Sequence, residues 1–170
     1  MSKIVFPHIS NRASKDDLEG VATTLERALY FAGALSIPGV FGAIIIGEEV
    51  LRIYGTEFTA GAVLLIVLSI ARVAQSYEVL LLQTLNALDL PEITFRIAIL
   101  FTVLNLGLNV ILAWTIGPVG AAISTAVSVA ISGGIAFKIV KQRVPLDIRH
   151  TPFFVQAVAS IFMGGVVFGI

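Results

Sequence analysis

IAILFTVLNLGLNVILAWTIGPVGAAISTAVSVAISGGIAF, residues 97–137, is a run of forty-one residues without a single Asp, Glu, Lys or Arg. A membrane-spanning helix needs only about 20 apolar residues, because each residue rises about 1.5 Å through a hydrocarbon layer about 30 Å thick. The run is therefore long enough for two spans, and Gly117-Pro118-Val119-Gly120 lies between them as a turn signal. We predict a helical hairpin with spans at about 97–116 and 119–137.

The composition of the whole chain is typical of a membrane protein. Of its 170 residues, 57% are hydrophobic and only 13% are charged, whereas a soluble chain carries about 25% charged residues. The eleven basic and eleven acidic residues cancel, so the basic surplus that nucleic-acid binding requires is missing. We predict an all-α, polytopic transmembrane helix bundle, surrounded by membrane lipid and without a nucleic-acid partner.

The sequence offers no group of residues with which an enzyme could work. It has no cysteine, and its two histidines, His8 and His150, lie far apart along the chain in polar segments. No HExxH, GxxxxGK[ST] or GxSxG pattern occurs. We therefore expect no catalytic residue, no metal site and no cofactor, and predict that the chain is not an enzyme.

Three more uncharged or nearly uncharged runs bring the expected number of spans to about five. The first span is predicted at about 28–47, where Pro38 should kink the helix, and the second at about 59–86. A fifth span begins in the uncharged run 152–170, which follows a basic loop at 138–151.

Residues 1–27 are predicted to form a cytoplasmic exit segment followed by an amphipathic linker helix. Ser14 followed by Asp17 resembles a helix N-cap signal, and apolar residues then recur at helical spacing. Such a helix fits two environments equally well: the membrane surface, or water as an ordinary solvated linker.

The basic residues are distributed unevenly over the two sides of the predicted bundle. Nine lie in segments on the same side as the N terminus, Arg52 alone lies on the other side, and Arg72 lies within a span. Since loops rich in Lys and Arg face the cytoplasm, we predict a multi-pass protein of the cell membrane with a cytoplasmic N terminus.

A polar stripe on the second span is the candidate substrate site. Arg72 lies near the middle of this span, where an arginine costs about 2.5–3.5 kcal/mol or more. At about 100° per residue it shares one helix face with four other polar side chains. The candidate substrate-binding residues are Arg72, Gln75, Ser76, Gln83 and Asn86. Such a face indicates a water-filled lumen; alternatively, Arg72 bonds to carbonyl groups of a neighbouring helix and only holds the bundle together.

Glu78 lies on the same span but points about 120° away from Arg72. A direct pair between the two is therefore not expected. We predict that Glu78 has its partner elsewhere or lies near the cytoplasmic end of the span.

Two further patterns occur on the hairpin. Small residues recur at every fourth position of its second helix: Gly120, Ser124, Ser128 and Ser132. This small-xxx-small pattern predicts that another helix approaches closely. Thr102, Asn105 and Asn109 share one face of the first helix, where they either join helices by hydrogen bonds or line the lumen.

Four short motifs occur in an order that resembles a known family. They are FPHIS at 6–10, LRIYGTEF at 51–58, NLGLN at 105–109 and IGPVGAAIST at 116–125. In this order and spacing they are similar to motifs of the lipid-linked oligosaccharide flippases of the multidrug/oligosaccharidyl-lipid/polysaccharide exporter superfamily. The resemblance covers about residues 4–143.

The resemblance implies a transporter with two six-helix lobes around a central cavity. Such a transporter flips polyprenyl-pyrophosphate-linked oligosaccharide by alternating access, for polysaccharide or glycan export, and Arg72 would face the pyrophosphate. The chain corresponds to only part of the second lobe, so we expect a fragment or a truncated gene that needs an N-terminal lobe or a second copy. The alternatives are a cation-coupled multidrug exporter of the same superfamily and a non-transporting membrane scaffold subunit.

The predicted orientation can be tested with single cysteines, because the chain has none of its own. In intact cells, an impermeant thiol reagent should label a cysteine at position 55 and leave one at position 3 unlabelled until the membrane is permeabilised. Labelling of position 3 but not of position 55 would show that the orientation is reversed.

Overall fold

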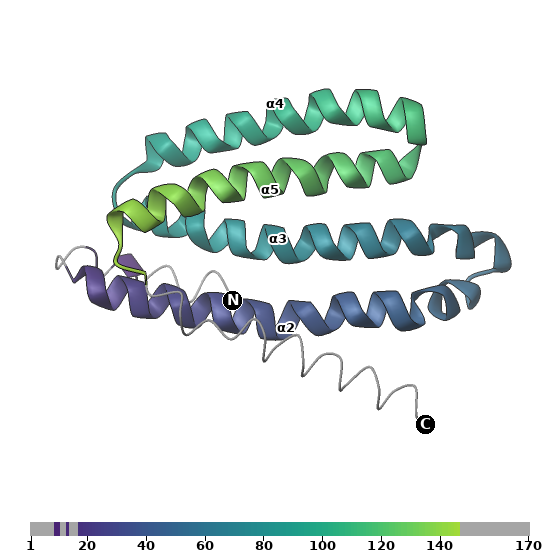
Figure 1. Cartoon of the computed structure of the whole chain (residues 1–170), viewed down its shortest axis with the longest axis horizontal. Helices are drawn as coiled ribbons and strands as arrows, with labels where there is room; N and C mark the ends of the chain where they lie inside the picture. Colours follow the sequence, from purple (N-terminus) through teal and green to yellow (C-terminus); the bar gives the residue numbers. More distant parts are fainter. Residues whose placement is uncertain (1–8, 11–12, 14–16, 147–170) are drawn as a thin grey trace.

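The computed structural model describes residues 9, 10, 13 and 17–146, which form an all-helical bundle (Figure 1). Its elements are α2 (Leu18–Arg52), η1 (Thr56–Gly61), α3 (Ala62–Ala87), α4 (Pro91–Ile116) and α5 (Pro118–Arg143). The described residues contain four helical segments long and apolar enough to cross a membrane. The predicted all-α bundle of membrane-spanning helices is thus confirmed, whereas the fifth span predicted at 152–170 lies outside the described residues.

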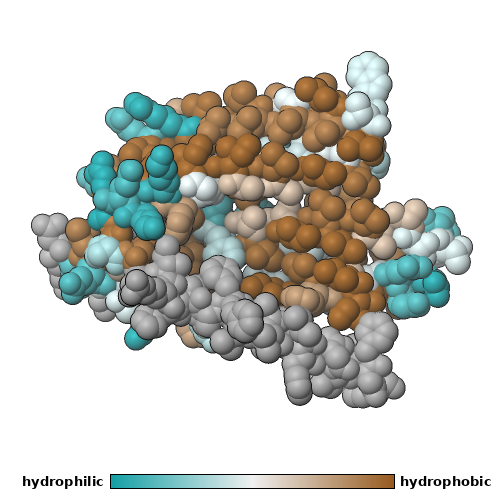
Figure 2. Space-filling model, viewed as in Figure 1, coloured by the Kyte–Doolittle hydropathy of each residue, from teal (hydrophilic) through white to brown (hydrophobic). Residues whose placement is uncertain are grey.

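The surface of the bundle has the distribution of hydropathy that a bilayer requires. Figure 2 shows apolar residues over the middle of the helices and hydrophilic residues at the two ends. Large side chains such as Leu35, Val103 and Trp114 are exposed on this surface, which would be unfavourable in water. The same exposure is favourable in hydrocarbon, so this pattern fits a membrane-spanning bundle.

Helix α2 unites two segments that the sequence analysis treated separately. The predicted linker helix and the predicted first span form one continuous helix of 35 residues, with Pro38 inside it. Asp17 caps this helix, since its Oδ1 accepts a hydrogen bond from the backbone N–H of Gly20 at 2.8 Å. Ser14, part of the predicted cap signal, lies outside the described residues. The charged residues before position 28 therefore do not mark the start of this helix, which begins at Leu18.

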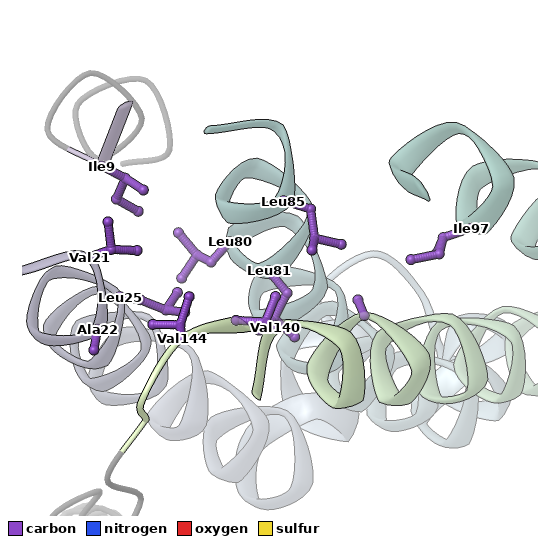
Figure 3. Close-up of a cluster of buried hydrophobic side chains, with 11 residues drawn as sticks. Ile9, Val21, Ala22, Leu25, Leu80, Leu81, Leu85, Ile97, Val140 and Val144 are labelled. Atoms are coloured by element: carbon purple, nitrogen blue, oxygen red, sulfur yellow. The ribbon is translucent and has the colours of Figure 1, made fainter. Parts of the chain in front are cut away.

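The described hydrophobic core lies at the end of the bundle where α2 starts and where α3 and α5 finish (Figure 3). Of the four apolar residues that form the face of the predicted linker, Val21, Ala22 and Leu25 are at most 4% exposed and belong to this core, whereas Leu18 is 37% exposed. They cluster with residues of α3 and α5, including Leu85 and Val140. The apolar face of the linker therefore packs against protein.

The predicted hairpin is confirmed as α4 and α5. Gly117 separates them with φ 65°, a backbone conformation that glycine adopts without strain. Pro118 then begins α5, where its missing N–H costs no hydrogen bond. Across the hairpin, Asn105 Nδ2 donates to Thr125 Oγ1 at 3.2 Å, so Asn105 does join two helices.

Helix α5 lies between α3 and α4, because it packs extensively against both. Its predicted stripe of small residues is fully buried: Ser124, Ser128 and Ser132 are each 0% exposed. At Gly120 a Cβ atom would overlap the backbone carbonyl of Leu112 in α4. The predicted close helix approach is therefore confirmed.

Replacement of Gly120 by alanine should destabilise the protein, because the new methyl group meets backbone that cannot rotate away. Overpacking of this kind costs on the order of 1–3 kcal/mol. Thermal unfolding of the solubilised protein, followed by the fluorescence of Trp114, would measure the effect. Gly107→Ala is the matched control, since nothing lies within 4 Å of a Cβ at Gly107. Equal melting temperatures for the two variants would contradict the close approach of α4 and α5.

Candidate functional site

Helix α3 turns the predicted polar stripe away from the rest of the described bundle. Its buried residues, among them Leu81 and Leu85, lie on the side that packs against the neighbouring helices. At about 100° per residue, Arg72 lies on the opposite side. Arg72 and Asn86 are exposed, and the three other predicted residues of the stripe are half-buried. The stripe thus forms an outward face of the four-helix bundle.

The structure brings Arg72 and Gln75 into direct contact. Arg72 Nη1 donates a hydrogen bond to Gln75 Oε1 at 2.7 Å. The hydroxyl of Ser76, next in the chain, donates to the carbonyl of Val73 at 2.7 Å within the same helix. Within residues 17–146, Arg72 makes no hydrogen bond to another helix. The guanidinium group therefore does not hold the described helices together.

The last two predicted residues lie well apart from Arg72. Asn86 follows Arg72 by fourteen residues, which places it about 21 Å farther along the helix axis. There it lines a polar cavity of about 600 Å³, together with Asp89 and Arg143. Gln83 Oε1 is buried and has no hydrogen-bond partner among the described residues. The predicted site therefore extends along α3, with Arg72 at one position and amide side chains at several others.

A second cavity lies between α2, α3 and α5 and has a volume of about 380 Å³. Its walls are mainly apolar, but three polar side chains line it: Glu26, Tyr77 and Glu78. Sequence analysis did not predict this cavity, because the residues that enclose it come from three separate parts of the chain. The isolated acid Glu78 within a predicted span was the one signal that pointed to it.

Glu78 is buried between α3 and α5. It is 6% exposed, and its carboxyl Oε1 shares a hydrogen bond with the hydroxyl of Ser132, which is 0% exposed. The expectation that Glu78 has its partner elsewhere is correct, and the partner comes from the small-residue stripe. Gly133 packs beside the acid, since a Cβ there would lie 3.6 Å from Glu78 Cβ.

The described residues contain no group of three or more His, Cys, Asp or Glu side chains that could hold a metal ion. The polar features of the bundle are instead one arginine with an amide partner and one buried acid with a hydroxyl partner. Such groups can bind an anion on the outward face of α3 and a proton or small cation inside the bundle.

Comparison with known proteins places this arrangement in a family. The model of the family "Lipid II flippase MurJ" matches residues 1–170. The solved structure "Lipid II flippase MurJ, inward closed conformation" superposes with a TM-score of 0.76 over 98% of this chain and 36% of that one. At 20% sequence identity, this superposition shows a shared fold.

Two proteins of Haloferax volcanii are similar in sequence. "Probable flippase AglR" is 40% identical over 141 residues, covering 81% of this chain and 30% of AglR. "Probable low-salt glycan biosynthesis flippase Agl15" is 31% identical over 170 residues, covering 99% of this chain and 36% of Agl15. The chain thus spans about a third of the length of these relatives. Because the family model matches it from the first residue to the last, the chain belongs to the Lipid II flippase MurJ family.

Proposed function

We propose that this chain forms part of a membrane transporter that flips a polyprenyl-pyrophosphate-linked oligosaccharide by alternating access, for glycan export. Its family and the flippase names of its relatives support this class of substrate. The observation that carries the proposal is the outward polar face of α3, which presents Arg72 from within a membrane-spanning helix.

Contact with lipid hydrocarbon would be energetically unfavourable for the polar face of α3. An arginine that faces hydrocarbon near the middle of the bilayer costs several kcal/mol, and the amides of the stripe add unpaired polar groups. Water or further protein must therefore cover the outward face of α3. A central cavity between two lobes provides both, with the other lobe supplied by sequence beyond this chain or by a second copy of it.

The chemistry of Arg72 suits a pyrophosphate. A guanidinium group has five N–H donors in a planar fork that matches the oxygens of a phosphate. One donor binds Gln75 Oε1, which fixes the orientation of the group and leaves the other donors for the substrate. Farther along α3, Asn86 has an exposed amide that can bind the hydroxyl groups of a sugar, whereas Gln83 would first have to turn its buried Oε1 outward.

The same face argues against the other functions. A scaffold subunit needs no continuous polar face within the membrane. An enzyme needs an activated nucleophile or an acid–base pair, and the one hydroxyl of the stripe, Ser76, donates to a backbone carbonyl without a base beside it. A drug exporter whose coupling cation shares the path of the substrate would need an acid among the residues of the stripe, whereas Glu78 lies on a different side of α3. We infer a non-enzymatic transporter in the cell membrane, with its N terminus in the cytoplasm.

Arg72→Ala should reduce flipping by about ten-fold or more. A hydrogen bond to a charged group contributes about 1.5–3 kcal/mol, and 1.4 kcal/mol corresponds to a factor of ten. Proteoliposomes that contain a fluorescent polyprenyl-pyrophosphate glycan would measure the rate, and Arg72→Lys should retain part of it because the positive charge remains.

Arg96→Ala is the control for the loss of a positive charge. Arg96 is 80% exposed at the start of α4 and lies 4.0 Å from Glu92, so its removal should leave flipping unchanged. Flipping at the wild-type rate by both Arg72→Ala and Arg72→Leu would rule out the proposed phosphate contact. If the transporter moved no glycan lipid even with both lobes present, the scaffold function would be favoured.

A further inference from the structure

The carboxyl group of Glu78 is enclosed within the described bundle without a cation beside it. Its hydrogen bond to Ser132 is the one bond it makes within residues 17–146, and the ion pairs of that region involve other acids. An ionised carboxylate in an apolar interior is costly unless a cation or several donors surround it. With one hydroxyl group as its partner, the neutral acid is the form that this environment accepts.

The hydrogen bonds available to Ser132 also favour the neutral, protonated form of Glu78. Ser132 Oγ lies within hydrogen-bond distance of three acceptors, Glu78 Oε1, the backbone carbonyl of Ser128 at 2.8 Å and that of Val129 at 3.3 Å, but a serine hydroxyl has only one hydrogen to donate. If Glu78 is ionised, either its own contact with Ser132 or the contact of Ser132 with the carbonyl of Ser128 lacks a hydrogen. If Glu78 carries a proton, the acid donates to Ser132 Oγ and Ser132 donates to the carbonyl of Ser128, so both contacts are hydrogen bonds.

Glu78 borders the cavity between α2, α3 and α5. The titratable groups that face it there are Glu26 of α2 and Tyr77 of α3. Helix α5 contributes no titratable group to the wall. Two carboxyl groups thus border one mainly apolar cavity.

A second serine on α5, one turn before Ser132, has a hydroxyl group without a hydrogen-bond partner among the described residues. This residue is Ser128, and its Oγ is fully buried. Ser128 and Ser132 both belong to the small-residue stripe, which lets α5 lie close to its neighbours. A buried hydroxyl without a described partner, one turn from Ser132, fits a site whose hydrogen bonds change during function.

We propose that Glu78 is a proton-binding site at the contact between α3 and α5. In the described packing the Glu78 carboxyl is protonated and donates a hydrogen bond to Ser132 Oγ. Release of the proton leaves a negative charge that the packing against α5 does not stabilise. The contact between α3 and α5 then loosens. The proposal deepens the proposed function by naming a proton as the coupling ligand of the transporter. It rests on that function only for the use of the proton, because binding itself needs no substrate.

Infrared spectroscopy of the full-length protein in lipid nanodiscs tests the proposal without any glycan lipid. At neutral pH the wild type should show the C=O stretch of a protonated carboxylic acid, and Glu78→Gln should abolish this band. Ser132→Ala should shift the band to higher frequency because the acid loses its hydrogen-bond acceptor, and Ser132→Thr should restore its position. Glu57→Gln, which changes an exposed acid in η1, is the control and should leave the band unchanged.

Thermal unfolding over a range of pH tests the link to packing. Deprotonation of Glu78 should lower the melting temperature of the wild type as the pH rises, whereas Glu78→Gln should lose this part of the dependence. An acid band that persists in Glu78→Gln, or a wild type without the band that is stabilised by sodium ions, would overturn the proposal. A failure to flip glycan lipid would leave both measurements intact and would count against the proposed function alone.

Discussion

The close approach of α5 to α3 and α4 is the contact on which the rest of the described structure depends. Between membrane helices there is little hydrophobic force, because lipid tails are as apolar as leucine side chains. Association then rests on van der Waals contact and on hydrogen bonds across the interface. Gly120 lets the backbone of α5 meet α4, and Ser132 provides a hydrogen bond to α3. A stripe of larger side chains would separate these helices and remove both contacts.

This packing also fixes the rotation of α3, and the rotation decides what each of its polar residues faces. With Glu78 turned toward α5, the geometry of the helix turns Arg72 outward, about 120° away. The proposed substrate contact and the proposed proton site therefore lie on two sides of one helix. A movement of α3 relative to α5 that changes the surroundings of Glu78 also moves Arg72, so coupling between the two needs no further device.

The sequence predicted those features that follow from local rules. The uncharged run and Gly117-Pro118 predict the hairpin, and the four-residue spacing from Gly120 predicts the close approach. Helical periodicity excludes a pair between Arg72 and Glu78. The features it missed depend on packing between distant segments. Ser132 lies 54 residues from Glu78, and the continuity of α2 through the polar stretch after Leu18 is stabilised by core residues from α3 and α5. No local pattern specifies either contact.

The contrast between α3 and α4 shows which side of this bundle can face lipid. Helix α4 has Ile97 as its one buried residue and exposes large apolar side chains such as Val103, Leu106 and Val110. Hydrocarbon satisfies such a surface. Helix α3 exposes Arg72 and Asn86, which hydrocarbon does not satisfy. The outward faces of α4 and α3 thus require different surroundings. A bundle that lies between lipid and a water-filled cavity meets both requirements. In the proposed transporter, this constraint favours an orientation with α4 toward the membrane and the stripe of α3 toward the path of the substrate.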